Sequence, residues 1–209
     1  MRNLLLIFMI AFTMNVSAQH NSLYYVFIDV TDSALVDTFK KQVKKAVPQM
    51  IAQAGVKKGN GIEIKFFSIS NLKQGVRASL KVTPREISFF ESKYDRPDEI
   101  EEATNKLPGI LKKFVKDTYP HTRIVDAVSA EMNKFKASRA KYKTIIVFSD
   151  LFENYTTSSQ ETLDWENIYF VRGIAKPGDQ NYVKAGDAHE NKWKQRIPNV
   201  IISTELELY

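Results

Sequence analysis

Two adjacent stretches decide the fold: the apolar run Leu23-Tyr-Tyr-Val-Phe-Ile28 and the polar run Asp29-Val-Thr-Asp-Ser33 that follows it. The first is continuously apolar and rich in β-forming residues, which is typical of a strand covered on both faces of a sheet. The second marks the turn into a helix, and Asp32 or Ser33 can cap that helix. Its carboxylate and two hydroxyls stand at alternate positions, where hard oxygen ligands can hold a divalent cation.

The remainder of the chain alternates predicted strands with predicted helices. The first helix carries lysines opposite its apolar stripe; Pro48 predicts a kink or a new turn, and Gly55 is typical of a helix end. Further strands are expected at 62–69, 76–82, 143–149, 168–171 and 199–203, and further helices at 98–106, at 109–116, from a cap at Thr122, and at 188–196.

This order predicts an α/β fold. Strands that alternate with helices favour a mostly parallel sheet with helices on both faces, a Rossmann-like three-layer α/β/α sandwich. The link between segments 62–69 and 76–82 is short, so we expect an antiparallel pair. The apolar residues of segment 76–82 alternate, which places this strand at an edge of the sheet.

The start of the chain has the pattern of an export signal. A positive end and an apolar run precede Val16-Ser17-Ala18, so residues 1–18 are predicted to form a signal peptide that is cleaved before Gln19. Residues 19–209 then form a single domain, periplasmic or secreted, with no transmembrane span after cleavage. An uncleaved membrane anchor is the alternative, because the run approaches the length needed to cross a bilayer.

Cysteine content and charge narrow the possible functions. The chain has no cysteine, which excludes disulfides, thiolate zinc sites and cysteine nucleophiles. The formal net charge of +6 comes from clustered lysines. These lysines are interpreted as the solvated faces of amphipathic helices, with an acidic partner as the alternative. A nucleic-acid partner is not expected of an exported protein.

Two downstream segments supply further oxygen ligands. Asp150 ends the apolar run 143–149, and Thr122 opens a predicted helix. In an open α/β sheet the carboxyl ends of parallel strands line one crevice, so these side chains are expected to converge on Asp29. The candidate metal ligands are all oxygen donors, which favours magnesium, with manganese or calcium possible, over zinc or copper: Asp29, Thr31, Ser33, Thr122 and Asp150.

The three motifs together resemble the metal-ion-dependent adhesion site (MIDAS) of von Willebrand factor A (vWA) domains. That site uses Asp-x-Ser-x-Ser after the first strand, a threonine opening a later helix, and an aspartate ending a central strand. The resemblance implies a non-enzymatic protein-binding domain, in which the cation accepts an aspartate or glutamate carboxylate from a partner protein. It further implies that Thr31, Ser33 and Thr122 bind the cation directly or nearly so, while Asp29 and Asp150 act partly through water.

The sequence also departs from the family's pattern. His121 and Leu151 stand where glycine is common in the family, and little chain follows the segment 199–203. The mobile C-terminal helix of switching family members is therefore not expected here.

Two alternatives remain open. In a metal-free vWA-like scaffold, Asp29 and Ser33 would only cap the first helix and Thr122 the later one. A magnesium-dependent phosphoesterase of the haloacid dehalogenase type also places an aspartate after its first strand. That chemistry wants a second aspartate two residues on, and this chain has Thr31 there.

Overall fold

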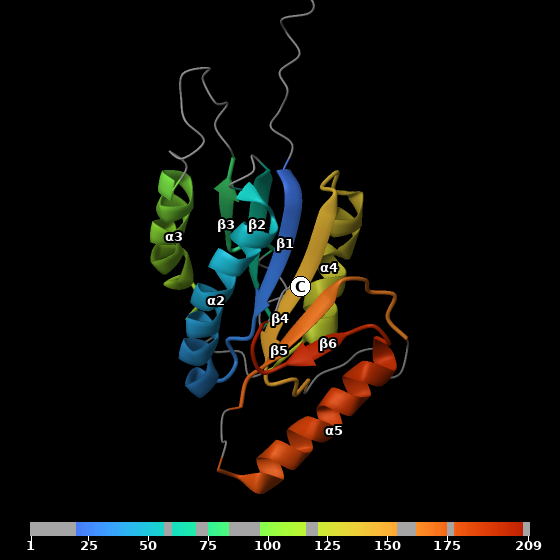
Figure 1. The fold of residues 1–209 in the computed structure, drawn as a ribbon. Helices are drawn as coiled ribbons and strands as arrows, with labels where there is room; N and C mark the ends of the chain where they lie inside the picture. The colour runs from blue at the N-terminus through green and yellow to red at the C-terminus, as the bar shows by residue number, and fades with distance from the viewer. Residues whose placement is uncertain are drawn as a thin grey trace, which may run out of the picture.

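A six-stranded, mostly parallel sheet forms the centre of the molecule (Figure 1). The structure is a computed structural model, and it describes residues 20–56, 60–69, 75–83, 97–115, 121–153, 162–174 and 178–206. The strands lie in the order β3-β2-β1-β4-β5-β6. Their bounds are β1 His20–Ile28, β2 Gly61–Ser68, β3 Ala78–Val82, β4 Tyr142–Ser149, β5 Ile168–Arg172 and β6 Ile201–Ser203.

Strand β1 lies in the middle of this sheet. It pairs in parallel with β2, where Val26 is opposite Phe66, and with β4, where Val26 is opposite Ile146. The predicted antiparallel pair is confirmed, since β3 runs antiparallel to β2 and lies at one edge of the sheet. The α/β class and the mostly parallel sheet are confirmed with it.

The described part of the chain contains four helices: α2 Ser33–Gln53, α3 Pro97–Leu111, α4 Ile124–Ala137 and α5 Gln180–Arg196. Of the two candidate caps for α2, Asp32 is the one used, because its carboxylate accepts the Ala34 N–H at 2.7 Å. Gly55 follows the end of α2 with a φ of 70°, as expected of a glycine that ends a helix. None of these helices combines the length and the apolar character that crossing a bilayer would require.

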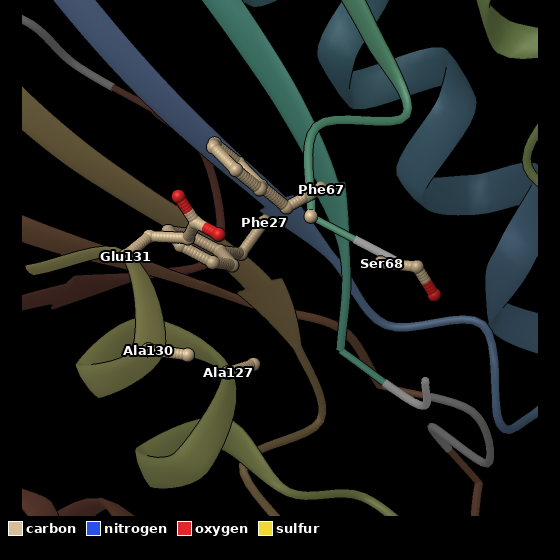
Figure 2. Close-up of a pocket in the computed structure, with 7 residues that line it drawn as sticks. Phe27, Phe67, Ser68, Ala127, Ala130 and Glu131 are labelled. Carbon is tan, nitrogen blue, oxygen red and sulfur yellow. The ribbon is translucent and has the colours of Figure 1, made fainter. Parts of the chain in front are cut away.

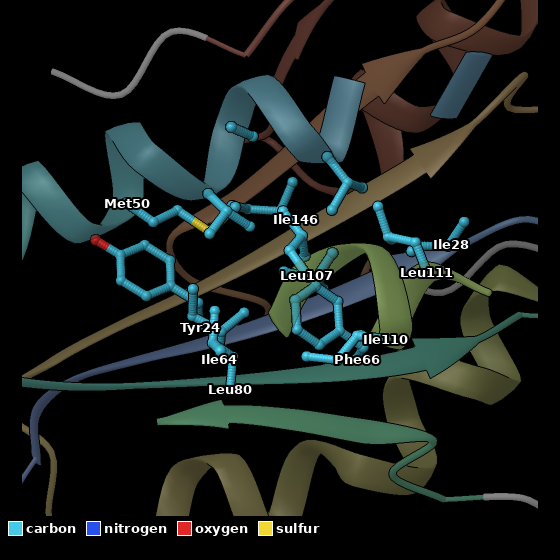
Figure 3. Close-up of a cluster of buried hydrophobic side chains, with 14 of the residues drawn as sticks. Tyr24, Ile28, Met50, Ile64, Phe66, Leu80, Leu107, Ile110, Leu111 and Ile146 are labelled. Atoms are coloured by element: carbon cyan, nitrogen blue, oxygen red, sulfur yellow. The ribbon is translucent and has the colours of Figure 1, made fainter. Parts of the chain in front are cut away.

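Two hydrophobic clusters cover the two faces of the sheet. Alternate residues of β1 point to opposite faces, Tyr24 into one cluster and Tyr25 into the other. Helices α2 and α3 supply the helical residues of the first cluster, where Met50 and Leu107 lie over the sheet (Figure 3). Helices α4 and α5 contribute to the second, with Trp193 as the buried residue from α5.

Three helix predictions were wrong. Segments 98–106 and 109–116 are not separate helices, because α3 runs through Pro108 and its apolar side chains on both sides of the proline are buried. This packing outweighs the hydrogen bond that proline removes. Helix α2 also runs through Pro48 as one element, and the kink predicted there stays a prediction. Helix α5 begins at Gln180 rather than residue 188, since Asp179 caps it through the Asn181 and Tyr182 N–H groups.

The end of β5 lies very close to α2, and this contact supplies a stability test. A methyl group added at Gly173 would approach Cε1 of Phe39 to 2.4 Å, and that phenyl ring is buried. We expect Gly173→Ala to lower the free energy of unfolding by about 1–3 kcal/mol, because the packed core cannot make room. Urea denaturation measures the change.

The matched control is Gly109→Ala, in helix α3. A methyl group there meets nothing within 4 Å. Alanine should therefore stabilise the helix by about 0.5–1 kcal/mol. Equal effects of the two substitutions would contradict the described packing of Gly173 against Phe39.

Candidate functional site

Asp29 is a buried carboxylate at the carboxyl end of β1. Only 4% of the residue is exposed, and its N–H donates to the Phe148 carbonyl at 2.9 Å, which continues the pairing of β1 with β4. The side chain is held by hydroxyls. Thr31 Oγ1 donates to Asp29 Oδ1 at 2.6 Å, and Ser149 Oγ donates to Asp29 Oδ2 at 2.9 Å. The Thr31 N–H also donates to Oδ1, at 3.0 Å.

Thr122 brings a third hydroxyl to the same carboxylate. Its Oγ1 lies 2.9 Å from Oγ1 of Thr31 and donates to Asp29 Oδ2 at 3.4 Å. Thr122 is buried and lies 93 residues from Asp29 along the chain. The structure therefore brings together three of the predicted ligands, Asp29, Thr31 and Thr122.

The prediction that Thr122 caps a helix was wrong. The N-cap position of α4 belongs to Arg123, whose side chain makes no capping hydrogen bond. Glu153 caps the first turn of α4 instead, because its Oε1 accepts the Val125 N–H at 2.9 Å. Because a distant carboxylate takes the capping role, the Thr122 hydroxyl faces Asp29.

Asp150 follows β4 and lies near Asp29. Its Oδ1 accepts the Phe152 N–H at 3.0 Å, and its Oδ2 accepts the Tyr182 hydroxyl at 3.1 Å. Burial raises the pKa of Asp150 from 3.8 to about 6, with a smaller contribution from the charge of Asp29. Burial also raises the pKa of Asp29, although the Thr31, Ser149 and Thr122 hydrogen bonds act against that rise.

Both pKa shifts show that the ionised forms of the buried Asp29 and the half-buried Asp150 are disfavoured. Two carboxylates lie within electrostatic reach of each other, and desolvation disfavours the ionised form of both. The nearby donors to Asp29 are neutral hydroxyls and one backbone N–H. A positive ion at this point would remove the electrostatic penalty, whereas the hydroxyls only reduce it.

Ser33, the remaining predicted ligand, is not part of this cluster. It is an exposed residue at the start of α2. Among the described residues, no hydrogen bond joins its side chain to Asp29, Thr31, Thr122 or Asp150.

Sequence reasoning missed Ser149 and Tyr182. Ser149 is a fully buried hydroxyl at the end of an apolar strand, and a buried polar group requires a partner, which was the available signal. Tyr182 lies 32 residues after Asp150 in a helix of polar character, and no sequence pattern links the two.

A small pocket lies between β1, β2 and α4. Figure 2 shows the rings of Phe27 and Phe67 and the carboxylate of Glu131 facing one another there. Its volume of about 20 Å³ holds roughly one water molecule. A larger hollow of about 280 Å³ lies at the opposite end of the sheet, at the start of β5 and β6. Neither pocket encloses the Asp29 cluster.

The described residues contain no group of three or more histidine, aspartate or glutamate side chains that could hold a metal ion. A cation site at Asp29 and Asp150 would thus depend on hydroxyl oxygens for its other ligands. In comparisons with known proteins, no family model matches the chain and no curated protein is similar to it.

The raised pKa of Asp150 predicts how stability depends on pH. Because the folded-state pKa of about 6 lies above the ordinary value of 3.8, this group stabilises the fold most below pH 3.8. Its contribution declines as pH rises to about 6 and stays low at pH 7. Asp150→Asn removes this dependence and should raise the free energy of unfolding at pH 7 by about 1–2 kcal/mol.

Urea denaturation in the presence of a chelator, between pH 3 and pH 7, measures the difference between wild type and variant. Asp164→Asn, at a side chain that is 89% exposed, serves as the control and should change stability little at any pH. A variant less stable than wild type at pH 7 would show that the Asp150 carboxylate is not a source of electrostatic strain.

Proposed function

We propose that this chain is an exported, non-enzymatic binding domain that captures a partner protein's carboxylate at a divalent cation. In this proposal residues 1–18 are a signal peptide and residues 19–209 a single vWA-like domain with a Rossmann-like three-layer arrangement, located in the periplasm or secreted. The cation is magnesium, or manganese or calcium, and the residues proposed to hold it are Asp29, Thr31, Ser33, Thr122 and Asp150.

The observation that carries the proposal is the burial of the Asp29 carboxylate among hydroxyls from three separate segments. Thr31, Thr122 and Ser149 contact it, and the charge of Asp150 acts on the same point. Holding the buried carboxylate of Asp29 near the half-buried carboxylate of Asp150 is unfavourable. Such an arrangement is expected where it serves binding, because strain of this kind is concentrated at functional sites.

The donors fit a hard cation. Carboxylate and hydroxyl oxygens are the ligands that magnesium and calcium prefer, and both threonine hydroxyls lie at the carboxylate. Ser33 belongs to the proposed set through the vWA resemblance alone, because its side chain lies outside the hydrogen-bonded cluster. A cation held mainly by neutral hydroxyls retains much of its charge, and this charge would attract a partner's aspartate or glutamate.

The metal-free scaffold is the second candidate, and one observation favours it. Asp29 accepts hydrogen bonds at both carboxylate oxygens from this chain's own groups, so its polar atoms are satisfied without an ion. An enzyme of the haloacid dehalogenase type requires a second aspartate two residues after Asp29, and this chain has Thr31 at that position. Its hydroxyl donates to Asp29 and is no substitute for a general acid or base.

Titration of the purified protein with Mn²⁺ or Mg²⁺ tests the proposal. Wild type should bind one ion, and thermal stability should rise with ion concentration because binding favours the folded state. Asp29→Asn should weaken binding by at least about tenfold, since it removes a charge at the centre of the cluster. Thr122→Val, which removes the hydroxyl while keeping the shape, should weaken binding in the same direction.

Asp164→Asn removes an exposed carboxylate and should bind as wild type does. If wild type remains folded and no ion binds at millimolar concentration, the scaffold is the better description. Hydrolysis of a generic phosphoester that is lost in Asp29→Asn would instead favour the enzyme.

A further inference from the structure

The four residues after β4 contact helix α5 one after another. Their partners lie along one side of the helix. The Tyr182 hydroxyl donates to Asp150 at 3.1 Å, and Trp193 Nε1 donates to the Leu151 carbonyl at 3.2 Å. The centre of the Phe152 ring lies 5.1 Å from that of Tyr182 and 4.5 Å from that of His189. Arg196 donates to the Glu153 carboxylate at 3.1 Å.

The same short segment is bound to the Asp29 cluster at its other side. Ser149 Oγ accepts the Leu151 N–H at 3.1 Å while donating to Asp29. Leu151 is fully buried and has a φ of 70°, in the left-handed region that a leucine rarely adopts. Segment 150–153 therefore connects the cluster to α5 through contacts on both of its sides.

Contacts with segment 150–153 form part of the attachment of helix α5. Figure 1 shows it running obliquely past the carboxyl ends of β4 and β5. Gly186 and Trp193 are its buried residues. Arg172, at the end of β5, also anchors the helix, because it donates to the Val183 carbonyl at 3.0 Å and to Asp187 at 2.6 Å. With so little apolar burial, its position is sensitive to the polar contacts with segment 150–153.

We propose that Tyr182 is a positioning residue for Asp150, and that it couples the cation site to helix α5. This inference rests on the proposed function. The hydroxyl donates to a carboxylate, a charge-assisted hydrogen bond that fixes the orientation of Asp150. A carboxylate fixed in this way loses less freedom when an ion binds.

The coupling runs in both directions. If docking of Tyr182 strengthens cation binding, cation binding must strengthen the docking of α5 by the same factor. Helix α5 thus becomes the element that responds when the site is filled. It lies between β5 and β6 in the chain, so this response needs no helix after the last strand.

Tyr182→Phe tests the inference with little risk to the fold. The variant keeps the ring that stacks on Phe152 and removes only the hydroxyl. Tyr142→Phe is the matched control, because Tyr142 is exposed at the start of β4, at the opposite end of that strand from Asp150. Two quantities are measured on full-length protein: the dissociation constant for Mn²⁺ by calorimetry, and the hydrogen exchange of α5 amides with and without Mn²⁺.

We expect Mn²⁺ to slow amide exchange in α5 of wild type and of Tyr142→Phe. In Tyr182→Phe the dissociation constant should rise by about tenfold, and most of the Mn²⁺-dependent slowing in α5 should be lost. Binding as tight as wild type, or tighter, in Tyr182→Phe would overturn the inference and leave the proposed function standing. Absence of Mn²⁺ binding in folded wild type would overturn both.

Discussion

The site is organised around the burial of one carboxylate. Asp29 ends the central strand of the sheet, and the hydrogen bond from its N–H to Phe148 continues the pairing with β4. This places the carboxylate where water is excluded, so it must be satisfied by the protein. Hydroxyls from the turn after β1, from the start of α4 and from the end of β4 converge on it.

That requirement connects parts of the fold that are distant in sequence. Thr122 can face Asp29 because Glu153 satisfies the first turn of α4 in its place. Glu153 is itself oriented by Arg196 of α5, and Asp150 by Tyr182 of the same helix. The geometry of the cluster and the position of α5 are therefore two aspects of one hydrogen-bonded arrangement. Through these hydrogen bonds, ion binding at the carboxylates is proposed to affect helix α5 at the surface of the molecule.

Sequence patterns predicted what depends on local composition. The apolar runs of β1 and β4, a capping residue at Asp32 or Ser33 and the alternating edge strand β3 were readable from residue order, because burial and hydrogen bonding act on each segment directly. The proximity of Asp29 and Asp150 was also predictable, since the parallel neighbouring strands β1 and β4 end at one side of the sheet. Ser33 was expected in the cluster, but as the first residue of α2 its side chain is exposed.

What could not be predicted depends on tertiary packing. The helix through Pro108 is held by buried side chains on both sides of the proline, and sequence alone overstated the effect of proline as a helix breaker. The early start of α5 was missed because its first turns carry no apolar stripe. Tyr182 and Arg196 became neighbours of the cluster only through the docking of that helix, which no local pattern specifies.

A crystal structure of the protein grown with Mn²⁺, measured at a wavelength where manganese scatters anomalously, tests the cation site at Asp29 most directly. We predict an anomalous peak bordered by the hydroxyls of Thr31 and Thr122 and by the carboxylates of Asp29 and Asp150. The direct hydrogen bond from Thr31 to Asp29 should be weakened or replaced. A structure at saturating Mn²⁺ with no peak there, and with the hydroxyls still hydrogen-bonded to Asp29 as they are now, would contradict the account.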